Sequence, residues 1–224
     1  LYEHNMIVFD GESVAMLENN KTIMNMSPEK NLLNVRFSPG EKILVDGQDL
    51  IGKFERGARS QNLLVLGGKL NVSLRAMNGC MMSMLGQLKS GDVKIDTINY
   101  VNRSNSELYE AIRQSSQRIT DLYTGSKYFE IGSKLDEWLD EVLQDVDNRL
   151  ADINSTTYYA PRIIVFYQPE NNEELHQKQD PNRPNRWIIS EFMEKFMKVL
   201  EKGPAVGVHC MFHFLDPDAY YSLF

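Results

Sequence analysis

The sequence predicts an α/β fold, in which a mostly parallel β-sheet is flanked by helices. Two segments, Leu63–Leu66 and Ile163–Phe166, are apolar without alternation, as in strands that are buried on both faces of a parallel sheet. The first segment ends in a glycine pair and precedes a long apolar helical pattern, which is half of a βαβ unit. Strand and helix patterns alternate from there on, and this order favours parallel strands joined by crossover helices.

The composition indicates a globular protein with one main hydrophobic core. The 224 residues are 42% hydrophobic and 25% charged, which excludes a collagen-like or wholly disordered chain. The two cysteines, Cys80 and Cys210, lie inside apolar segments, as buried thiols do in a reducing compartment. No segment has the length and apolarity of a membrane span and no secretory signal pattern is present, so we expect no membrane insertion and a cytoplasmic location.

Residues 1–60 are predicted to form a small N-terminal preamble that is partly β. It contains a short apolar strand pattern at residues 6–9, a polar helical pattern around residues 14–17, and β-like alternation with two turn signals between Asn34 and Phe54. The main α/β core would span residues 61–224. Because the chain starts at Leu1 and ends shortly after an apolar segment, we expect it to be cut from a longer protein, with the core truncated at its C-terminus.

The elements of the main core are predicted from apolar spacing. After the Leu63–Leu66 strand we expect a helix over 71–89, a strand over 93–101, helices over 106–122 and 131–150, the strand that contains Ile163–Phe166, an exposed mobile loop over 169–186, a helix over 188–201 and a strand over 206–215. The loop is assigned because it is polar and interrupted by prolines. The apolar segments should form adjacent central strands, with almost complete burial of Leu64, Val65, Ile164, Val165 and Val208.

Four short segments match the pattern of one known family. They are Asn62–Gly67 with the helix that holds Asn78, the strand Arg162–Phe166, the tripeptide Gly207-Val208-His209, and the lead-in at residues 7–12. They resemble, in the same order, the phosphate-loop strand and helix, the Walker B strand, the opening of the next core strand and the lead-in of FtsK/SpoIIIE and HerA-like DNA translocases. The resemblance implies a RecA-like P-loop NTPase core and action within a ring of subunits.

The residues that carry ATP chemistry in that family differ in this chain. Placing the motif Gly-x-x-x-x-Gly-Lys-Ser/Thr from Gly67 puts Val72 at the second glycine, Ser73 at the lysine and Leu74 at the hydroxyl position. The lysine that reaches the phosphates and the hydroxyl that binds Mg²⁺ are therefore missing. After the Walker B-like strand, Gln168 and Pro169 replace the acidic pair. The resemblance thus implies a degenerate ATPase domain, for which we expect no catalytic residue and no cofactor.

Two interpretations of Gly67-Gly68-Lys69 remain open. The glycines form either a strand-to-helix turn that needs positive φ, or a phosphate loop rebuilt around Lys69 that binds ATP and Mg²⁺, with Glu170 as a shifted acid. We favour the turn, and with it a structural or regulatory module of a DNA-translocase or DNA-processing assembly. Its partners would be other domains or subunits of that assembly. The third hypothesis is a protein-binding α/β module that is unrelated to nucleotides.

Three basic residues of the predicted loop, Lys178, Arg183 and Arg186, are candidates for contact with DNA or a partner. Three acidic residues of the same loop offset much of their charge, and the formal net charge of the chain is -7. DNA binding by this chain alone is therefore expected to be weak. We expect the Gly67 turn, this loop and the end of the 206–215 strand to converge at the carboxyl edge of the sheet.

Two further clusters of polar residues are expected to be structural. His209 and His213 would point to one face of their strand and Cys210 to the other, which suits a zinc site poorly, so no metal site is expected. The acidic residues between 136 and 147 are predicted to form a solvated helix face opposite an apolar stripe.

Overall fold

The computed structural model describes residues 25, 34–41, 49–57, 61–67, 70–89, 91–154, 156–180, 183–216 and 218–220. The patterns predicted at residues 6–9 and 14–17 lie outside this part of the chain, as do Gly68 and Lys69. The described elements are, in order, β1 (Asn34–Glu41), β2 (Asp49–Glu55), β3 (Leu63–Leu66), α2 (Leu70–Leu85), β4 (Lys94–Asn99), α3 (Ser106–Leu122), β5 (Lys127–Glu130), α4 (Asp136–Ala151), β6 (Arg162–Tyr167), η2 (Pro169–Asn171), η3 (Glu173–Leu175), β7 (Lys178–Asp180), β8 (Arg183–Ile188), α5 (Glu191–Lys202), η4 (Gly203–Val206) and β9 (Val208–Phe214).

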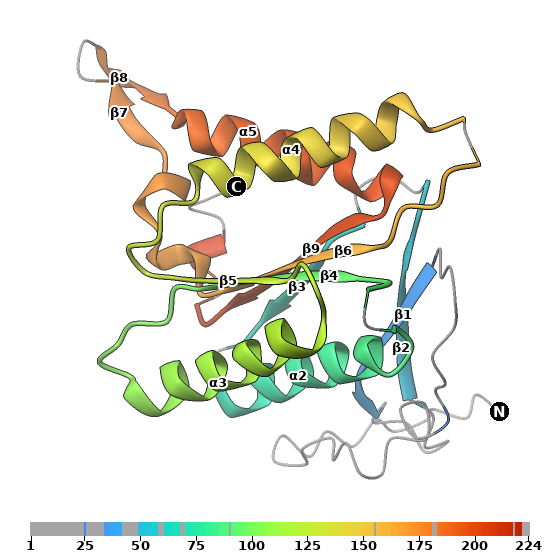
Figure 1. The fold of residues 1–224 in the computed structure, drawn as a ribbon. Coiled ribbons are helices and arrows are strands. Elements are labelled where there is room, and N and C mark those ends of the chain that lie inside the picture. Colours follow the sequence, from blue (N-terminus) through green and yellow to red (C-terminus); the bar gives the residue numbers. More distant parts are fainter. Residues whose placement is uncertain are drawn as a thin grey trace, which may run out of the picture.

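A parallel sheet forms the centre of the fold, which confirms the predicted α/β class. Five of the described strands pair in the order β3-β9-β6-β4-β5, and every pair is parallel. Figure 1 shows α4 and α5 on one face of this sheet and α2 and α3 on the other. The strand β9 therefore separates β3, where the phosphate-loop strand is predicted, from the Walker B-like strand β6.

The burial of the predicted central strands is confirmed for β6 and β9 but is wrong for β3. Ile164, Val165 and Val208 are fully buried. Leu64 and Val65 are only half-buried, and Leu66 is 40% exposed. Among the described strands β3 pairs with β9 alone, so it lies at an edge. An unbroken apolar pattern reports covered faces, and it carries no information about whether both strand edges are paired.

The sheet divides the interior into two apolar clusters, where the sequence predicted one main core. One cluster lies between the sheet and helices α4 and α5, and it contains Trp138, Phe166 and Phe196. The other cluster lies under α2 and α3 and extends to the β1–β2 hairpin, with Phe54 and Met77 among its members. A helix-covered sheet has two buried faces, so two clusters follow directly from the architecture.

The β1–β2 hairpin packs closely against α2. The N–H of Ser38 donates to Ser83 Oγ at 2.8 Å, and the N–H of Arg36 donates to Gln87 Oε1 at 3.2 Å. A Cβ added at Gly79 would lie 3.0 Å from the carbonyl oxygen of Ser38. The glycine thus allows the hairpin backbone to approach the helix, and a larger residue would force the two apart.

The segment predicted as an exposed mobile loop over 169–186 is exposed at many of its described residues, but these form regular structure where a loop was predicted. The 3₁₀ turns η2 and η3 fix its first part, where Leu175 is fully buried and Asn172 Nδ2 donates to Tyr100 Oη at 2.8 Å. The antiparallel hairpin β7–β8 follows and projects from the body of the molecule (Figure 1). Polar residues and prolines mark turns as readily as loops, and the single apolar anchor at Leu175 was overlooked.

One further strand and several boundaries also differ from the predicted ones. The short strand β5 was not predicted, because its four residues carry too little periodicity to stand out from the neighbouring turns. Residue Ile188, which was assigned to a helix, ends β8, and α5 begins after Ser190. The side chain of Ser190 caps this helix by accepting the N–H of Met193 at 3.0 Å.

A buried ion-pair network ties β4, β6 and α4 together. The guanidinium of Arg162 donates twice to Asp96 Oδ2, at 2.6 and 2.9 Å, and both side chains are almost completely buried. Arg162 Nη1 also lies 3.4 Å from Asp145 Oδ2, and Arg162 Nη2 lies 3.3 Å from Glu141 Oε1. Burial raises the pKa of Asp145, but its hydrogen bond to Arg149 and the charges of Arg149 and Arg162 act more strongly and lower it overall.

The predicted solvated acidic face of the 131–150 helix is confirmed except at Asp145, which is half-buried. Asp145 contacts Arg149 and Arg162, and Glu141 contacts Arg162 while staying exposed, as Asp136, Glu137 and Asp147 also are. A helical acidic stripe shows which residues share a face, but not whether a buried cation lies beneath one edge of it. Within the described residues, none of the helices combines the length and apolarity required to cross a bilayer.

Candidate functional site

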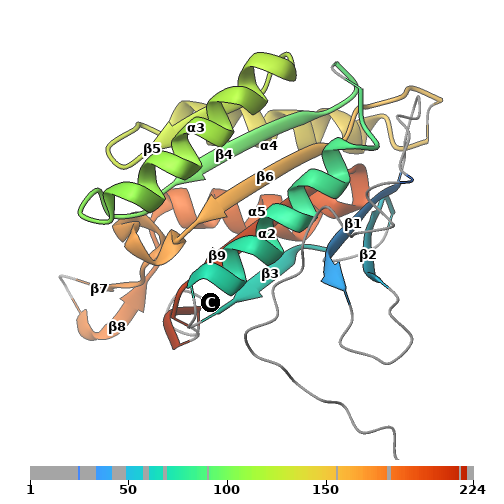
Figure 2. The ribbon, with the colours of Figure 1, turned by 90° about the horizontal axis from the view of Figure 1, so that it is seen from below.

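The carboxyl ends of β3, β9 and β6 meet at one edge of the sheet. The N–H of Gly67 donates to the carbonyl of Phe214 at 3.2 Å, and the N–H of Gln168 donates to the carbonyl of His213 at 2.8 Å. The N–H of Leu215 donates to Glu170 Oε1 at 3.1 Å. These bonds bring together the three segments expected to converge, on the side of the molecule toward which β7 and β8 extend (Figure 2).

Ser73, in the first turns of α2, fills the space where a phosphate-loop lysine is expected. A Cβ added at Gly67 would lie 2.4 Å from the Cβ of Ser73, so only glycine permits this contact. Ser73 Oγ and His213 Nε2 are 2.9 Å apart and share a hydrogen bond, and both side chains are buried. The hydroxyl of Ser73 is therefore engaged with the neighbouring strand inside the protein.

His213 is held neutral by its surroundings. Burial lowers its pKa from 6.5 to about 4. Its Nδ1 is buried and has no hydrogen-bond partner among the described residues. The same burial lowers the pKa of His209 to about 4, and its Nδ1–H donates to the carbonyl of Gln61 at 2.8 Å. The hydrogen bond to Ser73 is therefore made by an uncharged imidazole at neutral pH.

Protonation of the unfolded chain is expected to make the protein acid-sensitive. His213 titrates near 6.5 when unfolded and about 4 when folded, so the unfolded state binds more protons between these values and stability falls as pH falls. At pH 5 the loss amounts to about 2 kcal/mol for His213 alone. Urea unfolding at pH 7.5 and pH 5 gives the drop in the free energy of unfolding between the two pH values. This drop should be about 2 kcal/mol smaller in His213→Gln than in the wild type. An unchanged pH dependence in the variant would contradict the burial of His213.

Gln168 and Glu170 occupy the region where the family carries its Walker B acids. Gln168 has a left-handed backbone with φ of 52°, and its buried Oε1 accepts Asn171 Nδ2 at 3.2 Å, so it serves as a turn residue. Burial raises the pKa of Glu170. Its Oε1 is bonded to Leu215, whereas Oε2 is buried and has no hydrogen-bond partner among the described residues. Glu170 is thus the carboxyl group that follows β6 most closely in sequence, and it is the candidate to replace the Walker B acids.

The remaining candidate residues lie apart from this edge. Lys178 and Arg183 are exposed on the β7–β8 hairpin, and Arg186 belongs to β8. Their contact with DNA or a partner stays a prediction, as does a phosphate loop rebuilt around Lys69. Nowhere in the described part of the chain do three histidine, cysteine, aspartate or glutamate side chains gather as metal ligands would.

Sequence reasoning missed the contact between Ser73 and His213. The two residues are separated by 140 positions, and each was assigned a role on its own: Ser73 at the lysine position and His213 in a core or edge strand. Strand alternation places His213 on the same face as Met211, toward α2. That alternation, combined with the expected position of the α2 N-terminus, is the signal that would have paired them.

Comparisons with known proteins support the fold. No family model and no curated protein matches this sequence. The solved structure of EssC (ATPases 2 and 3) from Geobacillus thermodenitrificans has a TM-score of 0.50 and 12% identity, over 88% of this chain and 36% of that chain. Thermomonospora curvata EccC (ATPases 2 and 3), in complex with a signal sequence peptide, has a TM-score of 0.55 and 9% identity, over 86% of this chain and 34% of that chain. The chain spans about a third of the length of each, and what it shares with them is the fold, a helix-flanked parallel sheet.

Proposed function

We propose that this chain is an ATPase-fold domain that does not hydrolyse ATP and serves as a structural or regulatory module of a larger assembly. The contact of Ser73 with Gly67 and His213 carries the proposal. A phosphate loop needs a cation at this position that reaches outward to the phosphate oxygens. Here a short neutral hydroxyl is bonded to a neutral, buried imidazole. The contact stabilises the sheet edge, and neither Ser73 nor His213 offers a charge to a nucleotide.

The Walker B-like strand supports the same conclusion. Its first following residue, Gln168, is a buried turn residue that carries no charge to hold Mg²⁺ or polarise water. The strand itself keeps its complete burial. The fold is stabilised by burial of apolar surface, which does not depend on the polar groups of catalysis. Loss of the chemistry is therefore compatible with retention of the domain.

The partners of the module would be other domains or subunits. The chain matches about a third of the solved structures of EssC and EccC, each of which contains ATPases 2 and 3 of its protein. The sequence resembles DNA translocases, whereas EccC was solved with a signal sequence peptide. The net charge of -7 opposes broad attraction to phosphate. We therefore propose contact with protein as the main role of the domain, with DNA held by other parts of the assembly.

One observation favours a second candidate function, ATP hydrolysis at a rebuilt site. Glu170 Oε2 is a carboxyl oxygen without a hydrogen-bond partner among the described residues. Glu170 lies at the carboxyl edge of the sheet, where Gly67 follows β3. A carboxylate of this kind can hold Mg²⁺ through water or orient the attacking water. In this hypothesis Lys69 would supply the missing cation.

Phosphate release from Mg-ATP separates the two functions. We expect the chain to release phosphate no faster than buffer, because Ser73 and Gln168 replace the two groups that hydrolysis needs. Lys69→Ala and Glu170→Gln should then leave the blank-level rate unchanged. Glu173→Gln, which changes an exposed carboxylate three positions away, is the matched control. Turnover that disappears in Lys69→Ala and Glu170→Gln but persists in Glu173→Gln would contradict the proposal of an inactive module and show that the chain is an active ATPase.

A further inference from the structure

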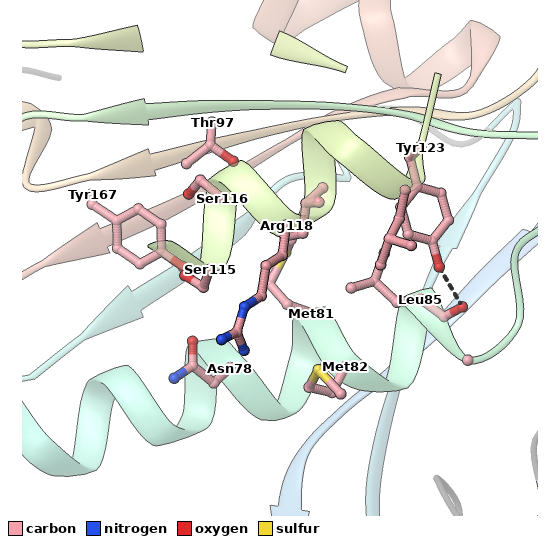
Figure 3. A pocket seen from close by; sticks show the side chains of 13 residues that line it. Asn78, Met81, Met82, Leu85, Thr97, Ser115, Ser116, Arg118, Tyr123 and Tyr167 are labelled. Atoms are coloured by element: carbon pink, nitrogen blue, oxygen red, sulfur yellow. Dashed lines mark hydrogen bonds between the residues drawn. The ribbon is translucent and has the colours of Figure 1, made fainter. Parts of the chain in front are cut away.

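A cleft of about 670 Å³ opens between helices α2 and α3. Residues of α2 form one wall and residues of α3 the other, and the sheet supplies Thr97 and Tyr167 as the floor (Figure 3). Its size lies within the range of about 300–1,000 Å³ that small-molecule sites occupy. None of the residues assigned to nucleotide, DNA or partner contact lines it.

The cleft exists because small residues stand where the rest of α3 carries large ones. This helix buries Leu108, Tyr109 and Ile112 against the sheet, but one turn later it presents Ser116, with Ser115 beside it. The opposite face of the sheet is filled by aromatic contacts such as Phe166 with Phe196, whose ring centroids are 5.1 Å apart. Two serines cannot fill the equivalent space under α3, so a hollow remains.

One end of the cleft is apolar. Met82, Leu85, Ile119 and Leu122 line it, and Met82 and Leu122 are 49% and 65% exposed at its rim. The hydroxyl of Tyr123 donates to the carbonyl of Leu85 at 3.2 Å, and this bond joins the end of α2 to the end of α3 (Figure 3). Methionine side chains adapt to ligands of different outline. This end suits an aliphatic or aromatic group.

The other end of the cleft carries a cation. Arg118 reaches from α3 toward α2, and its guanidinium lies beside the side chain of Asn78 (Figure 3). No described residue forms an ion pair with Arg118, whereas Arg113 on the same helix is paired with Glu110 at 2.7 Å. An unpaired guanidinium next to an amide donor is the arrangement that binds a carboxylate or sulfonate.

We propose that this cleft binds a small amphipathic anion, with its anionic group at Arg118 and Asn78 and its apolar body toward Leu85 and Tyr123. The polarity of the cleft changes along its length, from the cation to the apolar end, and so matches a molecule with one charged end. An amphipathic helix of a partner protein fits less well. It would cover Arg118 with its apolar face, and burial of an unpaired charge is costly.

Calorimetric titration of the full chain with decanoate, and with 1-decanol as the uncharged probe of the same length, tests the proposal. We expect one saturable site that prefers decanoate over 1-decanol by about ten-fold, since a charge-assisted hydrogen bond contributes about 1.5–3 kcal/mol. Arg118→Gln should remove this preference and leave 1-decanol binding unchanged. Arg113→Gln, an exposed arginine of the same helix outside the cleft, is the matched control and should behave as the wild type.

A second variant locates the site. Ser115→Phe places a ring in the cleft from an exposed position of α3, so folding should be preserved while both probes lose binding. Absence of saturable decanoate binding to the wild type would overturn the proposal. So would an equal loss in Arg118→Gln and Arg113→Gln, or unchanged binding in Ser115→Phe. These outcomes are independent of ATP turnover, because the cleft shares no residue with the carboxyl-edge site.

Discussion

Replacing Arg162 by methionine is expected to lower the free energy of unfolding by about 3–5 kcal/mol. The change removes the partner of Asp96 at a site where neither side chain is exposed by more than 1%. The Asp96 carboxylate would keep the hydrogen bonds from Trp138 Nε1 at 2.9 Å and from the N–H of Lys127 at 3.1 Å. Its charge would have no adjacent cation, and the cost of that buried charge causes the loss.

Urea unfolding followed by tryptophan fluorescence measures this effect, since Trp138 itself contacts Asp96. The double variant Arg162→Met with Asp96→Asn should recover part of the loss, because the amide leaves no buried charge. Its single oxygen can accept only one of the two remaining bonds, since these end on different oxygens of Asp96. Arg113→Met removes an exposed ion pair with Glu110 and should cost less than about 1 kcal/mol. Equal losses in Arg162→Met and Arg113→Met would show that the network is not buried.

The sequence predicted the parts of the fold that depend on local pattern. The continuous apolar segments of β6 and β9 and the spacing in α4 indicated buried strands and a helix, and these are observed. The edge position of β3 could not be predicted in this way. It depends on which strands pair, and pairing is set by contacts between distant segments such as Leu63 with Met211. Apolar content alone does not encode strand order.

The sequence predicted which residues belong to the candidate site, but not the contacts that they make. Gly67, Ser73 and Gln168 were singled out because a motif could be laid on the chain, and the structure describes all three. The bond from Ser73 to His213 and the ion pair of Arg162 with Asp96 join residues far apart in sequence. The cleft under α3 depends on space that two serines leave unfilled, and a periodicity analysis records serines only as polar positions.

The burial of the central strand β6 can be tested by core truncation. Phe166 on β6 is fully buried, and its ring lies 5.3 Å from that of Phe212 and 5.1 Å from that of Phe196. Phe166→Ala should lower the free energy of unfolding by about 3–5 kcal/mol, because the cavity would lie at the centre of an aromatic cluster that cannot close around it. Denaturant unfolding at neutral pH, with the slope checked for two-state behaviour, gives the value.

A matched pair of leucine truncations then separates the sheet edge from the interior. Leu139 on α4 is fully buried, whereas Leu66 at the end of β3 is 40% exposed. Leu139→Ala should cost about 2–5 kcal/mol and Leu66→Ala less than about 1 kcal/mol, since the exposed side chain loses little buried area and leaves no closed cavity. A cost for Leu66→Ala as large as that for Leu139→Ala would mean that β3 is covered in solution. In that case the strand is part of the sheet interior, as its apolar sequence first suggested, and the segment that covers it belongs to a partner or to a part of the chain beyond the described residues.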